Sequence, residues 1–152
     1  MKNNYGQVEP NHLSAQRNGQ IYAQLPAAIT LENGMFAKYD YEAGKVNLTG
    51  DGEWLLVYNE VKVYDNKESY NDFVMPAGGV PRLFKTNVGD IYTTNTFASS
   101  VKIDEVEVGN EFVPGSDGYL AAKSGDAEMV WKAVKVYTMP DGLPGVKLQR
   151  IK

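Results

Sequence analysis

The sequence WLLVY at residues 54–58 is apolar at every position. Successive side chains of a β-strand point to opposite faces, so a half-buried strand is apolar only at every second position. A strand that is apolar on both faces belongs in the centre of a sheet whose two faces are both covered. We therefore expect residues 54–58 to form a central strand in the core.

Outward from this stretch, the chain from Ile29 onward consists of short β-branched and aromatic runs bounded by Gly, Asp, Asn and Pro. This pattern predicts a mainly β domain, a compact antiparallel β-barrel or sandwich, with little helix because no long run carries a helical stripe. The strands are expected at residues 35–40, 45–49, 54–58, 61–64, 82–85, 91–95, 101–103, 106–108, 111–113, 119–122, 129–137 and 146–151.

Turn residues separate these runs. Three Asp-Gly pairs, at 51–52, 117–118 and 141–142, tolerate positive φ and predict tight turns between strands. The related segments 88–90 (VGD) and 108–110 (VGN) each predict a glycine-mediated turn into a strand. In 101–108 the apolar positions change from odd to even, which predicts a bulge or turn near residues 104–105.

The first 28 residues differ from the rest, because they are rich in Asn, Gln and Ala and show no strand or helix period. We interpret residues 1–28 as an extended N-terminal arm and residues 29–152 as a single β domain, with an internal division near the Pro- and Gly-rich loop 76–81. The spaced apolar residues predict that the arm binds to another surface. The candidate partner-binding anchors are Tyr5, Val8, Leu13, Ile21, Tyr22 and Leu25.

Composition excludes several classes of function. The net charge is −4, and no basic cluster is present, so nucleic-acid binding is not expected. The apolar runs are too short to span a bilayer, and the amino-terminal residues lack the apolar stretch of a secretion signal, so we expect neither a membrane span nor a removed leader. Without cysteine the chain has no disulfide and no thiol nucleophile.

Catalysis has little support in the sequence. The single histidine, His12, lies in the unpatterned arm, which argues against a Ser-His-Asp relay or a multi-histidine metal site. Carboxylates at i, i+2 spacing (Asp40 and Glu42, Asp51 and Glu53, Glu105 and Glu107) are compatible with acid and base roles in a glycosidase. We interpret them as solvent-facing strand positions. We expect no enzymatic activity, no cofactor and no metal.

Ten tyrosines and two tryptophans are compatible with a sugar-stacking platform or with a protein interface. Most of them fall where the expected strands need large core residues. A small β-sandwich carbohydrate-binding or host-adhesion module is therefore kept as the alternative function, and it predicts a cluster of exposed aromatic side chains on one face.

Taken as a whole, the chain resembles the small auxiliary or decoration proteins of tailed-bacteriophage heads, particularly of phages that infect Gram-positive hosts. The resemblance rests on the arm and on four segments of the second half: 88–95 (VGDIYTTN), 108–112 (VGNEF), 118–120 (GYL) and 145–149 (GVKLQ). Residues 60–82 have no counterpart in that pattern. No functional residue is carried over from the family.

The resemblance implies a non-enzymatic structural protein on the capsid surface of the virion, assembled in the host cytoplasm. Its partner is the lattice of major capsid protein, with a second copy of this chain as a further partner. An arm that orders only on assembled neighbours loses backbone entropy worth about 1–2 kcal/mol per residue. This implies weak binding to isolated subunits and tighter binding to the multivalent shell.

Overall fold

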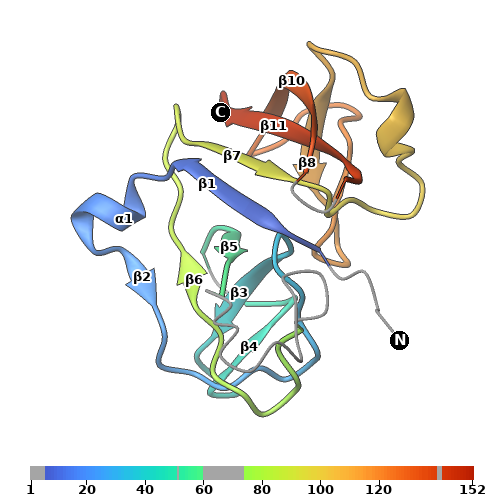
Figure 1. The fold of residues 1–152 in the computed structure, drawn as a ribbon. Coiled ribbons are helices and arrows are strands. Elements are labelled where there is room, and N and C mark those ends of the chain that lie inside the picture. The colour runs from blue at the N-terminus through green and yellow to red at the C-terminus, as the bar shows by residue number, and fades with distance from the viewer. Residues whose placement is uncertain (1–5, 51, 60–73, 140–141) are drawn as a thin grey trace.

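The structure, a computed structural model, describes residues 6–50, 52–59, 74–139 and 142–152 as two antiparallel β-sheets packed face to face (Figure 1). The six-stranded sheet has the order β1-β7-β11-β10-β8-β9, and the five-stranded sheet the order β2-β6-β5-β3-β4. The six-stranded sheet consists of β1 (Val8–His12), β7 (Ile91–Thr94), β8 (Glu111–Pro114), β9 (Leu120–Ala122), β10 (Trp131–Thr138) and β11 (Pro144–Arg150). The other consists of β2 (Ile21–Tyr22), β3 (Phe36–Asp40), β4 (Lys45–Asn47), β5 (Leu55–Val57) and β6 (Leu83–Phe84).

Strand β5 is the middle strand of the five-stranded sheet, and all three of its residues are buried. Leu56 points into a first core, which lies between the two sheets. Leu55 and Val57 point to the opposite face and into a second core. The prediction that residues 54–58 supply a central strand covered on both faces is therefore confirmed.

The first core joins the sheets through aromatic rings. Trp131 of β10 is fully buried, with its ring centroid 6.0 Å from that of Phe36 on β3 and 4.9 Å from that of Tyr92 on β7. The Tyr92 contact is edge-to-face, at an interplanar angle of 86°. Because Phe36 belongs to one sheet and Tyr92 and Trp131 to the other, this cluster fixes how the sheets face each other.

The second core is closed by irregular chain. Residues 26–31 run along the five-stranded sheet, where Ala27 bridges Val46 of β4 and Leu31 bridges Met75. The Val46 amide donates to the Pro26 carbonyl and the Ala28 amide to the Val46 carbonyl, both at 2.8 Å. These bonds occupy the backbone groups of Val46 on the outer edge of β4, which an exposed edge strand would otherwise leave unpaired.

The mainly β fold with little helix is confirmed. Over the described residues it is a sandwich and not a closed barrel, and its helices are one turn each, α1 (Ala15–Asn18) and η1 (Ile103–Glu105). The Asp117–Gly118 turn is confirmed as the connection of the β8–β9 hairpin, with Gly118 at φ +84°. Gly89 and Gly109 likewise adopt positive φ in turns that lead into β7 and β8.

Two predicted strands, at residues 101–103 and 106–108, are wrong. The chain forms η1 and then a turn closed by the Asn110 amide on the Glu107 carbonyl at 3.1 Å. Val106 is buried in the first core, and Val101 and Ile103 pack against it. The apolar residues thus serve side-chain packing without a partner strand, and the expected turn near residues 104–105 is present as η1. The predicted strand at 61–64 lies outside the described residues.

Residues 8–22 also differ from the expectation, since they contain β1, α1 and β2 where the sequence pattern predicts no regular element. The partner of β1 is β7, which follows some eighty residues later and pairs Val8 with Thr94 and His12 with Ile91. Because pairing with a distant strand makes β1 a strand, its own residues need not show the apolar alternation of a half-buried strand. Loop 76–81 lies inside the five-stranded half, and the chain crosses to the other sheet between β6 and β7.

Two tyrosine hydroxyls near the cores have opposite environments. The Tyr92 hydroxyl is buried and makes no hydrogen bond to any described group, and this burial raises its pKa well above the usual value. The Tyr119 hydroxyl donates to Glu32 Oε1 at 2.5 Å. Burial, followed by the bond to Glu32, raises the Tyr119 pKa.

We expect Tyr92→Phe to raise the free energy of unfolding by about 1 kcal/mol, because it removes a buried hydroxyl without a partner. The matched variant Tyr119→Phe removes the donor to the Glu32 carboxylate. It is expected to lower the free energy of unfolding by about 1–3 kcal/mol. Urea unfolding at neutral pH measures both. Equal effects of the two variants would contradict this account.

The burial of the Tyr92 hydroxyl predicts that the free energy of unfolding depends on pH. An unfolded tyrosine ionises near pH 10, whereas folded Tyr92 stays protonated at that pH. The unfolded state therefore releases protons first, and stability falls as the pH rises above about 10. Urea midpoints across this range are expected to fall less steeply for Tyr92→Phe than for the wild type.

Candidate functional site

The predicted arm anchors contact the chain's own cores. Leu13 is 3% exposed in the first core, and Val8 and Ile21 pack against the same cluster. Tyr22 and Leu25 pack against the second core. Tyr5 lies outside the described residues. The role of these six residues in binding a partner stays a prediction, and for the five described ones it now requires the arm to leave both sheets.

Polar contacts also hold the arm. The backbone amide of Gln7 donates to Asn95 Oδ1 at 2.8 Å, and Thr94 Oγ1 donates to the backbone carbonyl of Gln7 at 2.6 Å. Further along, Ser14 Oγ donates to the buried carboxylate of Asp90 at 2.9 Å. These bonds satisfy backbone and side-chain groups that lie at or near the sandwich interior, so residues 6–14 belong to the folded domain.

Leu13→Ala is expected to lower the free energy of unfolding by about 2–5 kcal/mol, the usual cost of emptying a buried leucine site. Val88→Ala is the control, since Val88 is 66% exposed and should change stability by no more than about 0.5 kcal/mol. Urea midpoints measure the difference. Equal midpoints for the two variants would mean that the arm is not part of the stable domain.

The outer half of β10, residues 134–138, has one edge without a partner strand in the described part of the structure. Its neighbour β8 pairs only with Trp131 and Lys132, and the next contacts join Ala133 to Gly109 and Asn110, both at 2.8 Å. From residue 134 to residue 138 β10 pairs with β11 alone, among the described residues. Alternation along the ladder points the N–H and C=O groups of Val136 and Thr138 toward this open edge.

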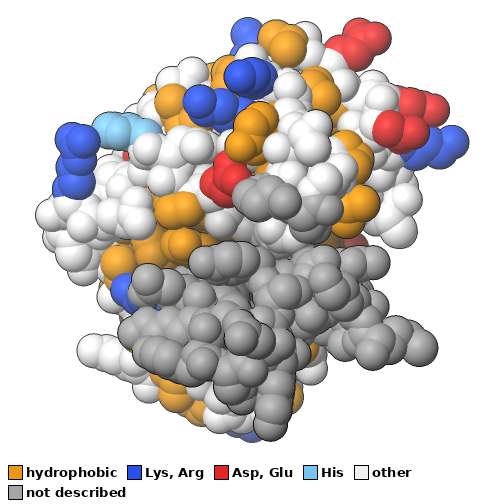
Figure 2. All heavy atoms as spheres, in the orientation of Figure 1, with side chains coloured by type: hydrophobic (Ala, Val, Ile, Leu, Met, Phe, Trp, Pro, Cys, Tyr) orange, Lys and Arg blue, Asp and Glu red, His pale blue; other side chains and the backbone are white. Residues whose placement is uncertain are grey.

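A β-bulge marks where the open edge begins. Ala133 pairs with Leu148 and Lys135 with Lys147, so Val134 is the extra residue. Beyond it Val136 pairs with the fully buried Val146 but is itself 45% exposed, because the core ends beneath it. Val134 and Tyr137 are also exposed. In Figure 2 hydrophobic and basic side chains lie side by side over the part of the molecule where Figure 1 places β10 and β11.

The charge beside this edge is positive, although the chain is acidic overall. Lys135 lies directly opposite Lys147, and Lys135 Nζ is 5.9 Å from the centroid of the Tyr137 ring. Neither lysine forms an ion pair with a described residue. Like charges directly opposite each other on two strands repel, so a carboxylate from a partner would relieve the pair.

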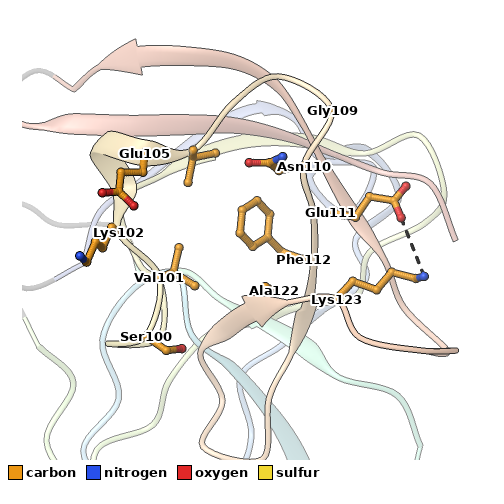
Figure 3. A pocket seen from close by; sticks show the side chains of 11 residues that line it. Ser100, Val101, Lys102, Glu105, Gly109, Asn110, Glu111, Phe112, Ala122 and Lys123 are labelled. Carbon is orange, nitrogen blue, oxygen red and sulfur yellow. Dashed lines mark ion pairs between the residues drawn. The ribbon is translucent and has the colours of Figure 1, made fainter.

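A shallow groove of about 580 Å³ lies between the η1 segment and the β8–β9 hairpin (Figure 3). Phe112 lies between its two walls, with Glu105 on one side and the Glu111–Lys123 ion pair of 3.9 Å on the other. The two carboxylates thus stand on opposite sides of an apolar floor.

The predicted carboxylate pairs are not assembled into a site. Glu105 lines the groove, but its predicted partner Glu107 does not. Asp40 ends β3 and Glu42 lies in the turn that follows, whereas Glu53 lies before β5 and forms ion pairs with Lys85 and Arg150. Asp40 Oδ1 accepts from the Ala43 amide, and Asp51 lies outside the described residues. His12 is exposed at the end of β1. No group of three metal-ligating side chains occurs in the described part of the chain.

An aromatic group is present on the second-core side. The Tyr39 ring contacts the rings of both Tyr22 and Tyr41. The centroid separation is 5.6 Å in each pair. Tyr41 is 72% exposed. From the sequence, most aromatic residues are expected in the core, and this cluster is not predicted. The two-residue spacing of Tyr39 and Tyr41 was the available signal.

Comparisons with family models, with curated proteins and with solved structures found no match to this chain. Among the described residues, no helix is long and apolar enough to cross a membrane.

Proposed function

We propose that this chain is a non-enzymatic structural protein of a tailed-bacteriophage head, which binds the assembled lattice of major capsid protein and stabilises it. The open edge of β10 carries the proposal, because backbone groups of residues 134–138 have no partner strand on this side within the described part of the chain and lie beside exposed apolar side chains. The resemblance of segments 88–95, 108–112, 118–120 and 145–149 to head decoration proteins supplies the identity of the partner.

The attachment is by strand addition. An extended segment of the capsid protein pairs with residues 134–138 and extends the six-stranded sheet by one strand. Its side chains cover Val136 and so lengthen the first core, while its carboxylates neutralise Lys135 and Lys147. Main-chain hydrogen bonds supply affinity, and the alternating side chains supply register.

A preformed edge binds differently from an arm that must first become ordered. The β10–β11 hairpin is already part of a sheet, so the entropy lost on binding falls mainly on the partner segment. The arm remains in its sheets, where β1 pairs with β7. In an assembled shell the same partner segment is repeated in a fixed geometry, which favours uniform occupancy of equivalent sites.

Val136→Lys is expected to reduce attachment to purified capsids at least about tenfold, because it places a positive charge on the apolar face of the open edge and removes apolar contact area. Val80→Lys is the matched control, since Val80 is 47% exposed and Val136 45%, and Val80 lies in loop 76–81 away from β10. The measurement is the copy number of this chain per major capsid protein on capsids that lack it before mixing.

The control variant should bind like the wild type. If Val136→Lys also binds like the wild type, attachment does not use the β10 edge. If the wild type does not bind capsids at all but forms dimers in solution that Val136→Lys abolishes, the edge serves a second copy of this chain and the capsid proposal fails.

A further inference from the structure

A small pocket of about 210 Å³ lies on the face of the five-stranded sheet that turns away from the six-stranded sheet. It is lined by Tyr22, Tyr39, Tyr41, Gly52, Glu53, Leu55 and Lys85. These residues come from β2, β3, β5, the turn after β3 and the ends of β5 and β6. The pocket therefore spans four adjacent strands of one sheet.

The pleat of the sheet and the ends of its strands explain why these side chains meet. Tyr39, Leu55 and Tyr22 belong to the second core, on one face of the sheet. Tyr41 lies in the turn after β3, Glu53 shortly before β5 and Lys85 directly after β6. The β3–β5 register pairs Ala37 with Leu55, and Tyr39 lies two residues further along β3 while Glu53 lies two residues before Leu55. An aromatic wall and a charged wall thus face one ligand-sized space.

The aromatic wall is held in place on its inner side. Tyr39 is buried, and its hydroxyl oxygen accepts a hydrogen bond from the Gln24 amide at 3.2 Å. Tyr41 packs edge-to-face on Tyr39 at 77°, while most of its surface stays in contact with solvent. An exposed aromatic ring anchored on a buried one is a platform on which an apolar ring face can stack.

The charged wall is likewise fixed. Glu53 Oε1 lies 3.4 Å from Lys85 Nζ, and Glu53 Oε2 lies 3.6 Å from Arg150 Nη2. The Arg150 guanidinium is itself held by the Thr86 carbonyl and the Thr86 hydroxyl. The pocket thus presents a carboxylate acceptor and an ammonium donor whose charges are already compensated, which favours an uncharged polar ligand.

We propose that this pocket binds one ring of a neutral saccharide. The C–H face of a pyranose ring stacks on Tyr41, and the hydroxyls of its polar edge hydrogen-bond to the Glu53 carboxylate and the Lys85 ammonium. A flat sugar ring combines an apolar face with a rim of hydroxyls, which is the combination these walls offer. This site lies on a different sheet from the β10 edge, and each proposal stands without the other.

The test uses the full chain and a panel of free neutral monosaccharides: glucose, galactose, mannose and N-acetylglucosamine. Saturation-transfer difference NMR detects binding, and the shifts of tyrosine ring protons on titration give the dissociation constant. At least one sugar is expected to bind and to shift the Tyr41 ring protons.

Tyr41→Ala is expected to weaken that binding about tenfold, because it removes the stacking ring. Tyr41→Phe keeps the ring and should bind within about twofold of the wild type. Glu42→Ala alters the adjacent exposed residue outside the pocket and is the control for local disturbance. Since Tyr41 is exposed, neither Tyr41 variant should unfold the chain, and urea midpoints verify this.

Two results would overturn the proposal. One is that no sugar of the panel binds the wild type. The other is that Tyr41→Ala and Glu42→Ala bind a sugar with the same affinity as the wild type, which would place the sugar elsewhere on the surface. Failure of the wild type to attach to capsids while it still binds a sugar would count against the β10 proposal only.

Discussion

The burial of β5 on both of its faces is the constraint on which the rest of the structure depends. Leu56 contributes to the core between the sheets, and Leu55 and Val57 contribute to a second core behind it. Each such side chain gains about 1.5–3 kcal/mol when it is removed from water. The five-stranded sheet therefore requires a cover on each face. The six-stranded sheet covers one, and residues 26–31 with Met75 contribute to covering the other.

This requirement also explains the use of the N-terminal segment. Leu13 and Ala15 complete the first core, and Tyr22 and Leu25 pack on the second, so the chain between β1 and β4 connects both layers. An arm with these roles stabilises the domain in which it lies. Where the first core ends, beneath Val136, the β10–β11 hairpin continues with one edge open. The proposed interaction surface thus begins where the two-sheet packing stops.

Much of the fold was predictable from local pattern, because WLLVY at 54–58 and the glycine turns at 89, 109 and 118 are specified by residues close in sequence. The arm was not, since β1 is a strand only by virtue of β7. Residues 101–108 were misread as strands because their apolar residues serve packing alone. The β10 surface depends on strand register. The apolar positions change from odd to even numbers after Ala133, which signals the bulge. Only the pairing with β11 shows which edge of β10 is open.

The central claim, that the preformed β10 edge and not the arm binds the capsid, is tested most directly by backbone hydrogen exchange of the chain alone and bound to purified capsids. The amides of Val136 and Thr138 are expected to exchange rapidly in the isolated chain and to become protected on the capsid. Residues 8–12 should be equally protected in both states, because β1 is already paired with β7. Protection gained at residues 8–22 with no change at 134–138 would contradict the account.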